Sequence, residues 1–201
     1  TSGSMHGEPI EAVKNGVKTL LTTLKQDPYA LETAWVSVST FDSSARQAVP
    51  LTDLLSFQMP PLSASGTTSL GEALSLAARS ITHEVQKTTA DTKGDWRPLV
   101  FLMTDGSPTD DWRKGLNDFK TARTGVVVAC AAGHDADTGI LKEITEIVLQ
   151  LDTADSTSIK AFFKWVSASI SVGSQKIESN KKEVICLDDL PPPPPEVNVV
   201  L

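Results

Sequence analysis

Three short segments of the sequence carry side chains that could bind a metal ion. Ser2 and Ser4 stand near the beginning, Thr67 lies in a polar stretch, and Asp105 comes soon after the apolar run Leu99–Met103. Hydroxyl and carboxylate oxygens are hard ligands, which suit Mg²⁺, Ca²⁺ or Mn²⁺ better than zinc or copper. The sequence therefore offers four candidate oxygen ligands for a divalent cation.

Each segment also has a simpler interpretation when it is taken by itself. Residues 1–5, Thr-Ser-Gly-Ser-Met, could be a cloning remnant ahead of a starting methionine. Residues 66–69, Gly-Thr-Thr-Ser, could cap the following helix, and Asp105-Gly106 could form only a turn. The metal-site interpretation depends on their conjunction, since all three segments fall where predicted strands should end.

Hydrophobic periodicity predicts the elements that position these segments. The predicted strands cover residues 34–41, 45–51, 99–103, 125–131 and 147–151, and the predicted helices cover residues 10–24, 70–87, 111–121, 138–144 and 159–170. Because strands and helices alternate, we predict an α/β fold with a doubly wound, mostly parallel sheet and helices on both faces. Ligands of such sheets bind at the carboxyl ends of the strands, where all three segments would lie.

Composition limits the classes of partner. The 201 residues are 40% hydrophobic and 21% charged, which is typical of a globular domain. With 18 basic and 25 acidic residues the net charge is −7, which disfavours nucleic acid and anionic membranes. No apolar run approaches the roughly 20 residues of a membrane span. Two cysteines, Cys130 and Cys186, are too few for a disulfide framework or a zinc site, so we expect a cytoplasmic protein.

The segments together resemble the von Willebrand factor A family. That family has a metal-ion-dependent adhesion site (MIDAS) made of Asp-x-Ser-x-Ser, a distant threonine and a distant aspartate. Ser2 and Ser4 match the serines, Thr67 matches the threonine in its Gly-Thr context, and Asp105 matches the aspartate of Thr-Asp-Gly. The resemblance covers about residues 1–170 and implies a Rossmann-like fold that binds Mg²⁺, or else Mn²⁺ or Ca²⁺.

The resemblance also implies a role for each ligand. Ser2 and Ser4 would bind the cation directly, Thr67 directly or through water, and Asp105 through coordinated waters. A protein partner would supply an acidic side chain to an open coordination position. We expect Asp42, Asp110 and Asp111, on the rim of this site, to be solvated turn and helix-start charges.

Other segments are similar to the small bacterial tellurium-resistance members of the family, the TerY-like proteins. These segments are Gly7-Glu8-Pro9-Ile10, residues 40–45, residues 101–110 and the proline-rich end. This resemblance implies a cytoplasmic role in resistance to tellurite and related chemical stress, beside kinase-like and phosphatase-like proteins. The predicted domain covers residues 1–172, and residues 173–201, with the run Pro191–Pro195, form a proline-rich tail or strap.

The sequence departs from the family pattern at its beginning. The family's first motif starts with an aspartate, directly after a hydrophobic strand in the middle of the sheet, and neither precedes Ser2 here. We therefore expect the sheet to lack its first central strand, and the natural polypeptide to carry about ten more residues upstream.

Two other functions compete with metal-dependent protein binding. A Mg²⁺-dependent phosphohydrolase could use the same strand-end site, and a metal-free scaffold could bind partners through its proline-rich tail. The sequence has no Gly-x-Ser-x-Gly elbow, phosphate-binding Gly-x-x-x-x-Gly-Lys loop or Gly-x-Gly-x-x-Gly fingerprint. We therefore predict an interaction module and not an enzyme.

Overall fold

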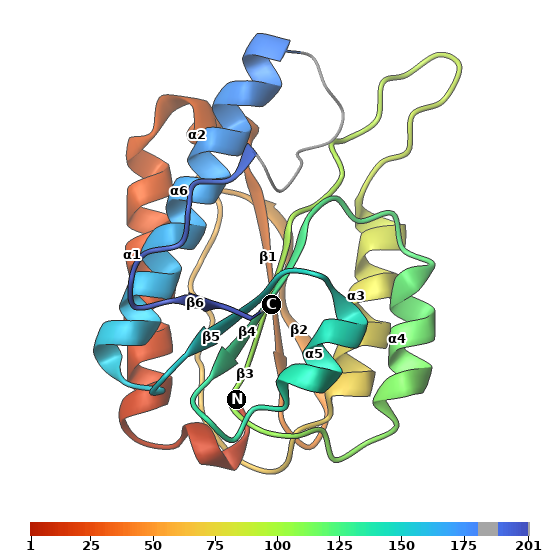
Figure 1. Ribbon diagram of the computed structural model, residues 1–201. Helices are drawn as coiled ribbons and strands as arrows, with labels where there is room; N and C mark the ends of the chain where they lie inside the picture. The colour runs from red at the N-terminus through yellow and green to blue at the C-terminus, as the bar shows by residue number, and fades with distance from the viewer. Residues whose placement is uncertain (181–188, 201) are drawn as a thin grey trace.

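The computed structural model describes residues 1–180 and 189–200, and the side chains of its last helix up to Gln175 (Figure 1). Cys186 lies outside the described residues. The helices are η1 (Gly3–Met5), α1 (Glu8–Gln26), α2 (Pro28–Thr33), α3 (Leu70–Glu84), α4 (Trp112–Lys120), α5 (Thr138–Ile144) and α6 (Ser156–Asn180). The strands are β1 (Trp35–Phe41), β2 (Ala45–Asp53), β3 (Val100–Thr104), β4 (Val127–Ala132), β5 (Val148–Leu151) and β6 (Asn198–Val199).

The strands form two sheets. β3, β4 and β5 are parallel neighbours, and β6 pairs antiparallel with β5, which gives the order β3-β4-β5-β6. β1 and β2 form a separate antiparallel pair. The structure confirms the predicted α/β class with its parallel sheet, although the described strands do not join into one sheet.

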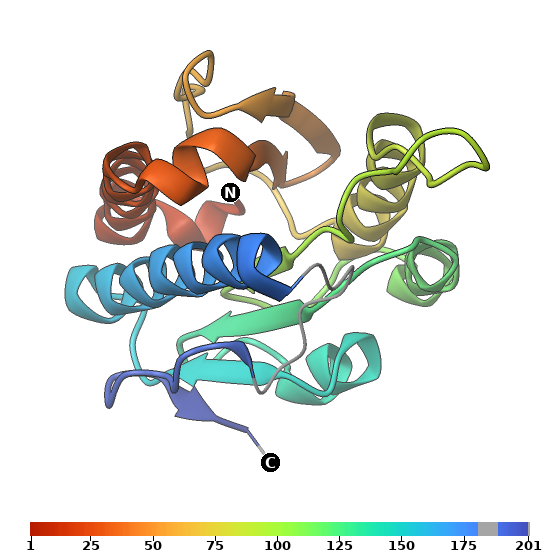
Figure 2. The same ribbon diagram turned by 90° about the horizontal axis from the view of Figure 1, so that it is seen from above.

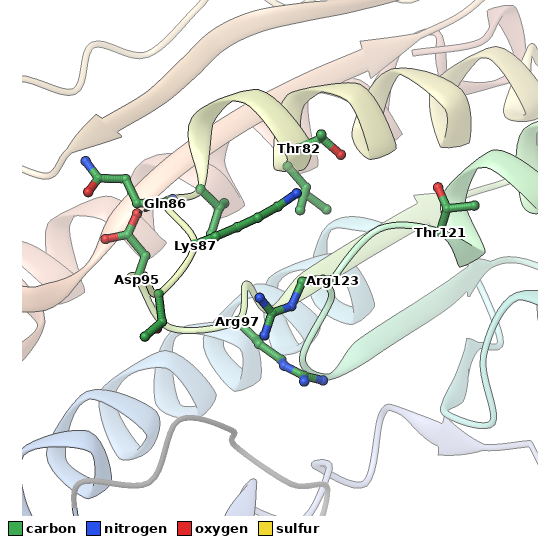
Figure 3. Close-up of a pocket in the computed structure, with 10 residues that line it drawn as sticks. Thr82, Gln86, Lys87, Asp95, Arg97, Thr121 and Arg123 are labelled. Carbon is green, nitrogen blue, oxygen red and sulfur yellow. Dashed lines mark hydrogen bonds between the residues drawn. The ribbon is translucent and has the colours of Figure 1, made fainter. Parts of the chain in front are cut away.

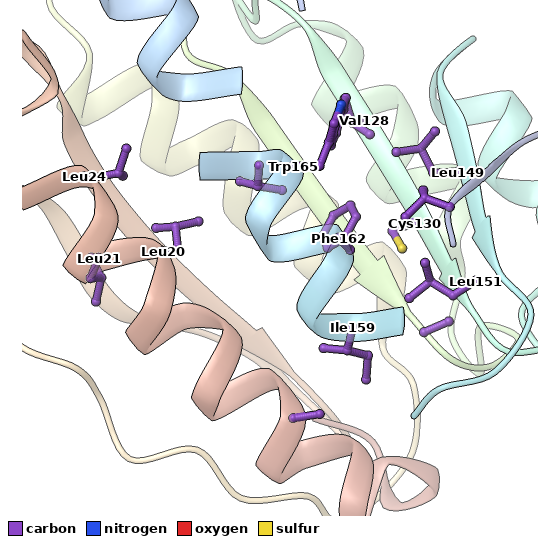
Figure 4. Packing of buried hydrophobic residues seen from close by; sticks show 14 of the residues in the cluster. Leu20, Leu21, Leu24, Val128, Cys130, Leu149, Leu151, Ile159, Phe162 and Trp165 are labelled. Atoms are coloured by element: carbon purple, nitrogen blue, oxygen red, sulfur yellow. The ribbon is translucent and has the colours of Figure 1, made fainter. Parts of the chain in front are cut away.

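Helices cover both faces of the four-stranded sheet (Figure 2). β4 shows why, because its residues from Val128 to Ala132 are all buried and alternate between two cores. Val128 and Cys130 belong to the larger core under α1 and α6, drawn in Figure 4 with Leu24 and Phe162. Ala129 and Ala131 pack on the opposite face of the sheet, in a smaller core that includes residues of α5. An apolar strand of this kind requires cover on both faces.

The second large core lies between α3, α4 and the sheet. Its buried members are Leu70, Leu74, Trp112, Leu116 and Phe119. The two helices approach so closely that a Cβ atom added to Gly115 would collide with the backbone of Gly71. α3 packs against β1 and β2 as well as against α4.

Two helices differ from the prediction, since α2 was not predicted and α6 is longer than predicted. Asp27 ends α1 and also caps α2, because its carboxylate accepts hydrogen bonds from the backbone N–H groups of Tyr29 (3.0 Å) and Ala30 (3.4 Å). Pro28 occupies the first position of α2, where its missing N–H costs no hydrogen bond. α6 continues to Asn180, beyond the predicted helix over 159–170.

The proline-rich segment lies on the domain in the manner of a strap. The indole Nε1 of Trp165 donates a hydrogen bond to the carbonyl oxygen of Pro191 (2.8 Å), and Val197 is 4% exposed in the larger core. β6 then pairs with β5 at Leu149 and Gln150. Among the helices described here, none combines the length and the hydropathy of a membrane span.

Candidate functional site

Ser2, Ser4 and Asp105 meet at the carboxyl end of β3. The Ser2 hydroxyl donates to Oδ1 of Asp105 (2.8 Å), and the hydroxyl oxygens of Ser2 and Ser4 lie 3.1 Å apart. Ser2 is 5% exposed and Asp105 is 7% exposed, so this contact is largely shielded from water. The structure therefore brings together three of the four predicted ligands, across 103 positions of sequence.

Local structure fixes each partner of this contact. Residues 3–5 form the 3₁₀ turn η1, in which the N–H of Met5 donates to the carbonyl of Ser2 (3.0 Å). The Met5 side chain is buried and anchors the turn. Asp105 is the first residue after β3, so the sheet delivers its carboxylate to this edge.

The loop before α3 is joined to the N-terminal segment. The N–H of Gly3 donates to the carbonyl of Gly66 (3.0 Å), and the N–H of Ser65 donates to the carbonyl of Thr1 (2.9 Å). Gly66 has a φ of 69°, and a Cβ atom there would collide with Ser43. Glycine is therefore required for this loop to reach the site.

Thr67 lies on the outer side of this loop. Its side chain is exposed, and both its N–H (3.2 Å) and its hydroxyl (3.4 Å) donate to the hydroxyl of Ser43. Neither hydrogen bond reaches Ser2 or Asp105. Thr67 as a metal ligand stays a prediction.

The neighbouring Thr68, which was not among the predicted ligands, lies close to Gly106, the residue that follows Asp105. It is 6% exposed, and a Cβ atom added to Gly106 would lie 3.8 Å from its Oγ1. The Thr68 N–H donates to Oγ1 of Thr109 (3.1 Å), and the Thr68 carbonyl accepts from the N–H of Thr109 (2.9 Å). The residue type does not distinguish these adjacent threonines, whereas their burial and their hydrogen-bond partners do.

The rim aspartates have structural hydrogen bonds. Both carboxylate oxygens of Asp110 accept from the first turn of α3, at the N–H groups of Gly71 (3.0 Å) and Glu72 (2.9 Å). Asp111 caps α4, as expected of a helix-start charge, and Asp42 accepts from the N–H of its own turn. Asp110 thus fastens the loop after β3 to α3.

The electrostatics of the site involve the N-terminal amine. Its pKa is lowered because the group is partly withdrawn from water, and the charges of Asp105 and Asp42 oppose this effect. Thr1 also donates its hydroxyl hydrogen to the carbonyl of Phe41 (2.8 Å), at the end of β1. The start of the described chain is therefore held between two strand ends.

The donor set fits a hard divalent cation. The described residues contain no group of three or more His, Cys, Asp or Glu side chains placed to hold a metal. A centre at this edge would instead use hydroxyl oxygens together with one carboxylate, Asp105, which suits Mg²⁺ or Mn²⁺. So few protein ligands would leave coordination positions for water or a partner's oxygen.

A separate pocket lies at the other end of α3 (Figure 3). It is lined by Lys87, Arg97 and Arg123 together with Thr82 and Asp95, and the Asp95 carboxylate accepts the N–H of Gln86 (2.8 Å). Because α3 begins beside Asp110 and ends at this pocket, the pocket is remote from Asp105. It plays no part in the candidate cation site.

Cys130 is not placed to act as a nucleophile or as a metal ligand. It is fully enclosed in β4, and burial raises the pKa of its thiol far above the ordinary value. The reactive thiolate is therefore suppressed.

Solved structures show the same fold at low sequence identity. The von Willebrand factor type A protein from Catenulispora acidiphila has a TM-score of 0.60 and 19% identity, over 85% of this chain and 40% of that one. Proximal thread matrix protein 1 from the mussel byssus has a TM-score of 0.59 and 19% identity, over 83% of this chain and 45% of that one. A form of that mussel protein with a zinc-occupied MIDAS motif has a TM-score of 0.57 and 19% identity, over the same shares of the two chains.

This chain thus spans less than half the length of these proteins. A search of curated proteins gave no significant match. The sequence profile of the von Willebrand factor type A domain matches residues 1–164, which is most of the chain. The chain belongs to the von Willebrand factor type A domain family.

Proposed function

We propose that this protein is a cation-dependent protein-binding module. The observation that supports this proposal is the buried contact of Ser2 with Asp105, beside the hydroxyl of Ser4. Ser2, Ser4 and Asp105 would hold the cation with Thr67 or Thr68. A bound cation would supply a Lewis-acidic, positively charged centre on a chain whose net charge is −7.

The chain's own residues orient this centre. The Asp105 carboxylate accepts the Ser2 hydroxyl hydrogen and so fixes the direction of the serine oxygen. Burial of both residues strengthens their interaction with a cation, because less water competes. An acidic side chain of a protein partner is the chemistry that fits the remaining coordination positions.

The identity of the cation is part of the proposal. Hydroxyl and carboxylate oxygens favour Mg²⁺, and Mn²⁺ has similar preferences. A mussel protein of the same fold has a zinc-occupied MIDAS motif, so zinc belongs among the cations to be compared. We propose Mg²⁺ as the preferred ion.

The biological setting is proposed from the sequence resemblance. We propose that the module acts in the bacterial cytoplasm, in resistance to tellurium compounds and related chemical stress, with kinase-like and phosphatase-like partners. An enzymatic role has less support. In the described part of the chain, no histidine, lysine or cysteine is hydrogen-bonded to Ser2, Ser4 or Asp105, and the one carboxylate that accepts the Ser2 hydroxyl hydrogen is the carboxylate that we propose as a cation ligand.

Titration calorimetry with Mg²⁺, Mn²⁺ and Zn²⁺ tests the proposal. Asp105→Asn removes the charge of the site and keeps its shape, and we expect affinity for the cation to fall by about 10- to 100-fold. Asp91→Asn is the matched control, because Asp91 is an exposed loop aspartate. Equal affinities for the two variants, both folded by circular dichroism, would contradict the assignment.

The protein-binding step needs its own measurement. A fluorescent peptide with a single glutamate should bind with Mg²⁺ and be released by EDTA, whereas its glutamine counterpart should not bind. Binding that is the same with EDTA would exclude a cation-mediated contact.

A further inference from the structure

The pocket at the end of α3 gathers positive charge on an acidic chain. Lys87, Arg97 and Arg123 line it from three different segments (Figure 3). Among the described residues that line it, Asp95 is the one carboxylate, so these side chains leave two net positive charges. The chain as a whole has a net charge of −7. A concave positive region of this kind concentrates anions from solution.

The loop after α3 fixes the position of Lys87. The N–H of Gln86 donates to Oδ2 of Asp95 (2.8 Å), and the N–H of Asp95 donates back to the carbonyl of Gln86 (3.0 Å). The N–H of Gly94 donates to Oγ1 of Thr88 (3.1 Å), and a Cβ atom on Gly94 would collide with the Thr88 backbone. Lys87 therefore stands between two residues that are both fastened to the far side of the loop.

Arg97 and Arg123 lie at the amino ends of β3 and β4. Arg97 comes shortly before β3, and Arg123 lies in the connection between α4 and β4. The N–H of Gly125 donates to the carbonyl of Pro98 (2.9 Å), and a Cβ atom on Gly125 would lie 3.3 Å from Cβ of Arg97. The parallel pairing of β3 with β4 continues this contact. The sheet thus delivers both arginines to the same pocket.

These three cationic side chains are not neutralised within the protein. Across the residues that the structure describes, no carboxylate forms an ion pair with Lys87, Arg97 or Arg123. Glu84, the last residue of α3, instead accepts a hydrogen bond from the side chain of Gln47 on β2 (2.7 Å). Like charges that share a pocket raise the free energy of the folded protein, and an anion bound between them removes this cost.

The hydroxyl groups of the pocket leave recognition to the cations. Thr82 donates its hydroxyl hydrogen to the carbonyl of Ala78 (2.8 Å), and Thr121 donates to the carbonyl of Asp118 (2.6 Å). The remaining donors are therefore chiefly guanidinium and ammonium N–H groups. Guanidinium groups pair with two oxygens of one anion, and phosphoryl groups offer three such oxygens.

From these observations we propose that Lys87, Arg97 and Arg123 bind a phosphoryl group that carries two negative charges. A phosphate monoester has a charge of about −1.5 to −2 at pH 7, which matches the net charge of the pocket, whereas a carboxylate would neutralise half of it. Free inorganic phosphate and a phosphorylated side chain of a protein partner both present this chemistry. The site is independent of the cation site, since α3 separates the pocket from Asp110.

The test measures binding in the presence of EDTA, so that a metal ion at Asp105 does not recruit the phosphate. Calorimetry with inorganic phosphate examines the free anion. Fluorescence anisotropy of a peptide with a single phosphoserine, beside its serine and glutamate counterparts, examines the protein-bound source. Arg97→Gln and Arg123→Gln each remove one guanidinium group. Arg79→Gln is the matched control, because Arg79 is exposed on α3 and does not line the pocket.

We expect at least one of the two phosphoryl probes to bind the unchanged protein with a Kd of about 1 mM or below. Each glutamine variant of the pocket should weaken that binding by about 10-fold or more, and Arg79→Gln by less than about 2-fold, with all variants folded by circular dichroism. Tighter binding of the phosphoserine peptide would assign the site to a phosphorylated partner, and tighter binding of inorganic phosphate would assign it to the free anion.

Three results would overturn the proposal. The first is that neither phosphoryl probe binds. The second is that the glutamate peptide binds as tightly as the phosphoserine peptide, since two charges would then have no advantage over one. The third is that Arg79→Gln weakens binding as much as the pocket variants do, because the attraction would then come from the general charge of the surface. None of these results bears on cation binding at Asp105.

Discussion

At the scale of single residues, the hydroxyl groups of the adjacent Thr67 and Thr68 lie in different surroundings. Thr67 is exposed and bonded to Ser43 in the turn between β1 and β2, whereas Thr68 is buried and lies close to Gly106, next to Asp105. A ligand must lie within bonding distance of the same ion as its partners. Burial and proximity to Gly106 favour Thr68 as the metal ligand, whereas the Gly-Thr motif of the sequence favours Thr67.

Replacement of each threonine by valine separates these two assignments. Valine keeps the branched shape and removes the hydroxyl oxygen. If Thr68 is the ligand, we expect Thr68→Val to weaken Mg²⁺ affinity by about 10-fold or more and Thr67→Val to change it by less than about 2-fold. Titration calorimetry measures both.

Thr68→Ser is the matched control, because it restores an oxygen at the same position and should restore most of the affinity. The opposite ranking of the two valine variants would return the role to Thr67. Because Thr68 is buried, the free energy of unfolding of each variant is measured by urea denaturation alongside affinity.

At the scale of elements, the contact between α3 and α4 depends on glycine. Gly71 lies in the first turn of α3 and Gly115 lies within α4, and a Cβ atom on Gly115 would collide with the Gly71 backbone. Asp110 bonds to this same first turn of α3 and links it to the loop after β3. The spacing of the helices is thus coupled to the position of the site loop.

We expect Gly115→Ala to lower the free energy of unfolding by about 1–3 kcal/mol, since the collision outweighs the better helix propensity of alanine. Asn117→Ala, on the exposed side of the same helix, is the control and should have an effect of less than about 0.5 kcal/mol. Urea denaturation followed by circular dichroism compares them. A Gly115→Ala protein as stable as the unchanged protein would show that the helices can separate without cost.

The helices and strands that were predicted from sequence are those whose hydrophobic period is long enough to recognise. α2 was not predicted, because Asp27-Pro28 both ends α1 and begins α2. From the sequence alone the pair indicates only the end of the first helix. β6 was missed because two residues show no period, and their strand exists only through pairing with β5.

The candidate site was predicted in part for a similar reason. Residue type and placement at strand ends were sufficient to predict that Ser2, Ser4 and Asp105 lie close together, as their hydrogen bonds show, and their role as metal ligands stays a prediction. The choice between Thr67 and Thr68 depends on which face of a loop is buried, and loops have no period from which this could be read.

At the scale of the whole molecule, the proline-rich segment completes one side of the fold. Trp165 of α6 bonds to Pro191, the buried Val197 belongs to the larger core, and β6 covers the outer edge of β5. A segment held at three places is poorly placed to serve as a free ligand for an aromatic groove. These contacts favour a strap over a free interaction tail.

The strap can be tested with two valines that stand two positions apart. Val197 is 4% exposed and Val199 is 53% exposed, so the same Val→Ala change removes buried side-chain volume in one case only. We expect Val197→Ala to lower the free energy of unfolding by about 1–2 kcal/mol and to speed hydrogen exchange in β5, because its edge is then less firmly covered. Val199→Ala should change stability by less than about 0.5 kcal/mol. If the two variants were equally stable, the segment would contribute nothing to the folded domain, and binding of a partner through its prolines would become the stronger explanation.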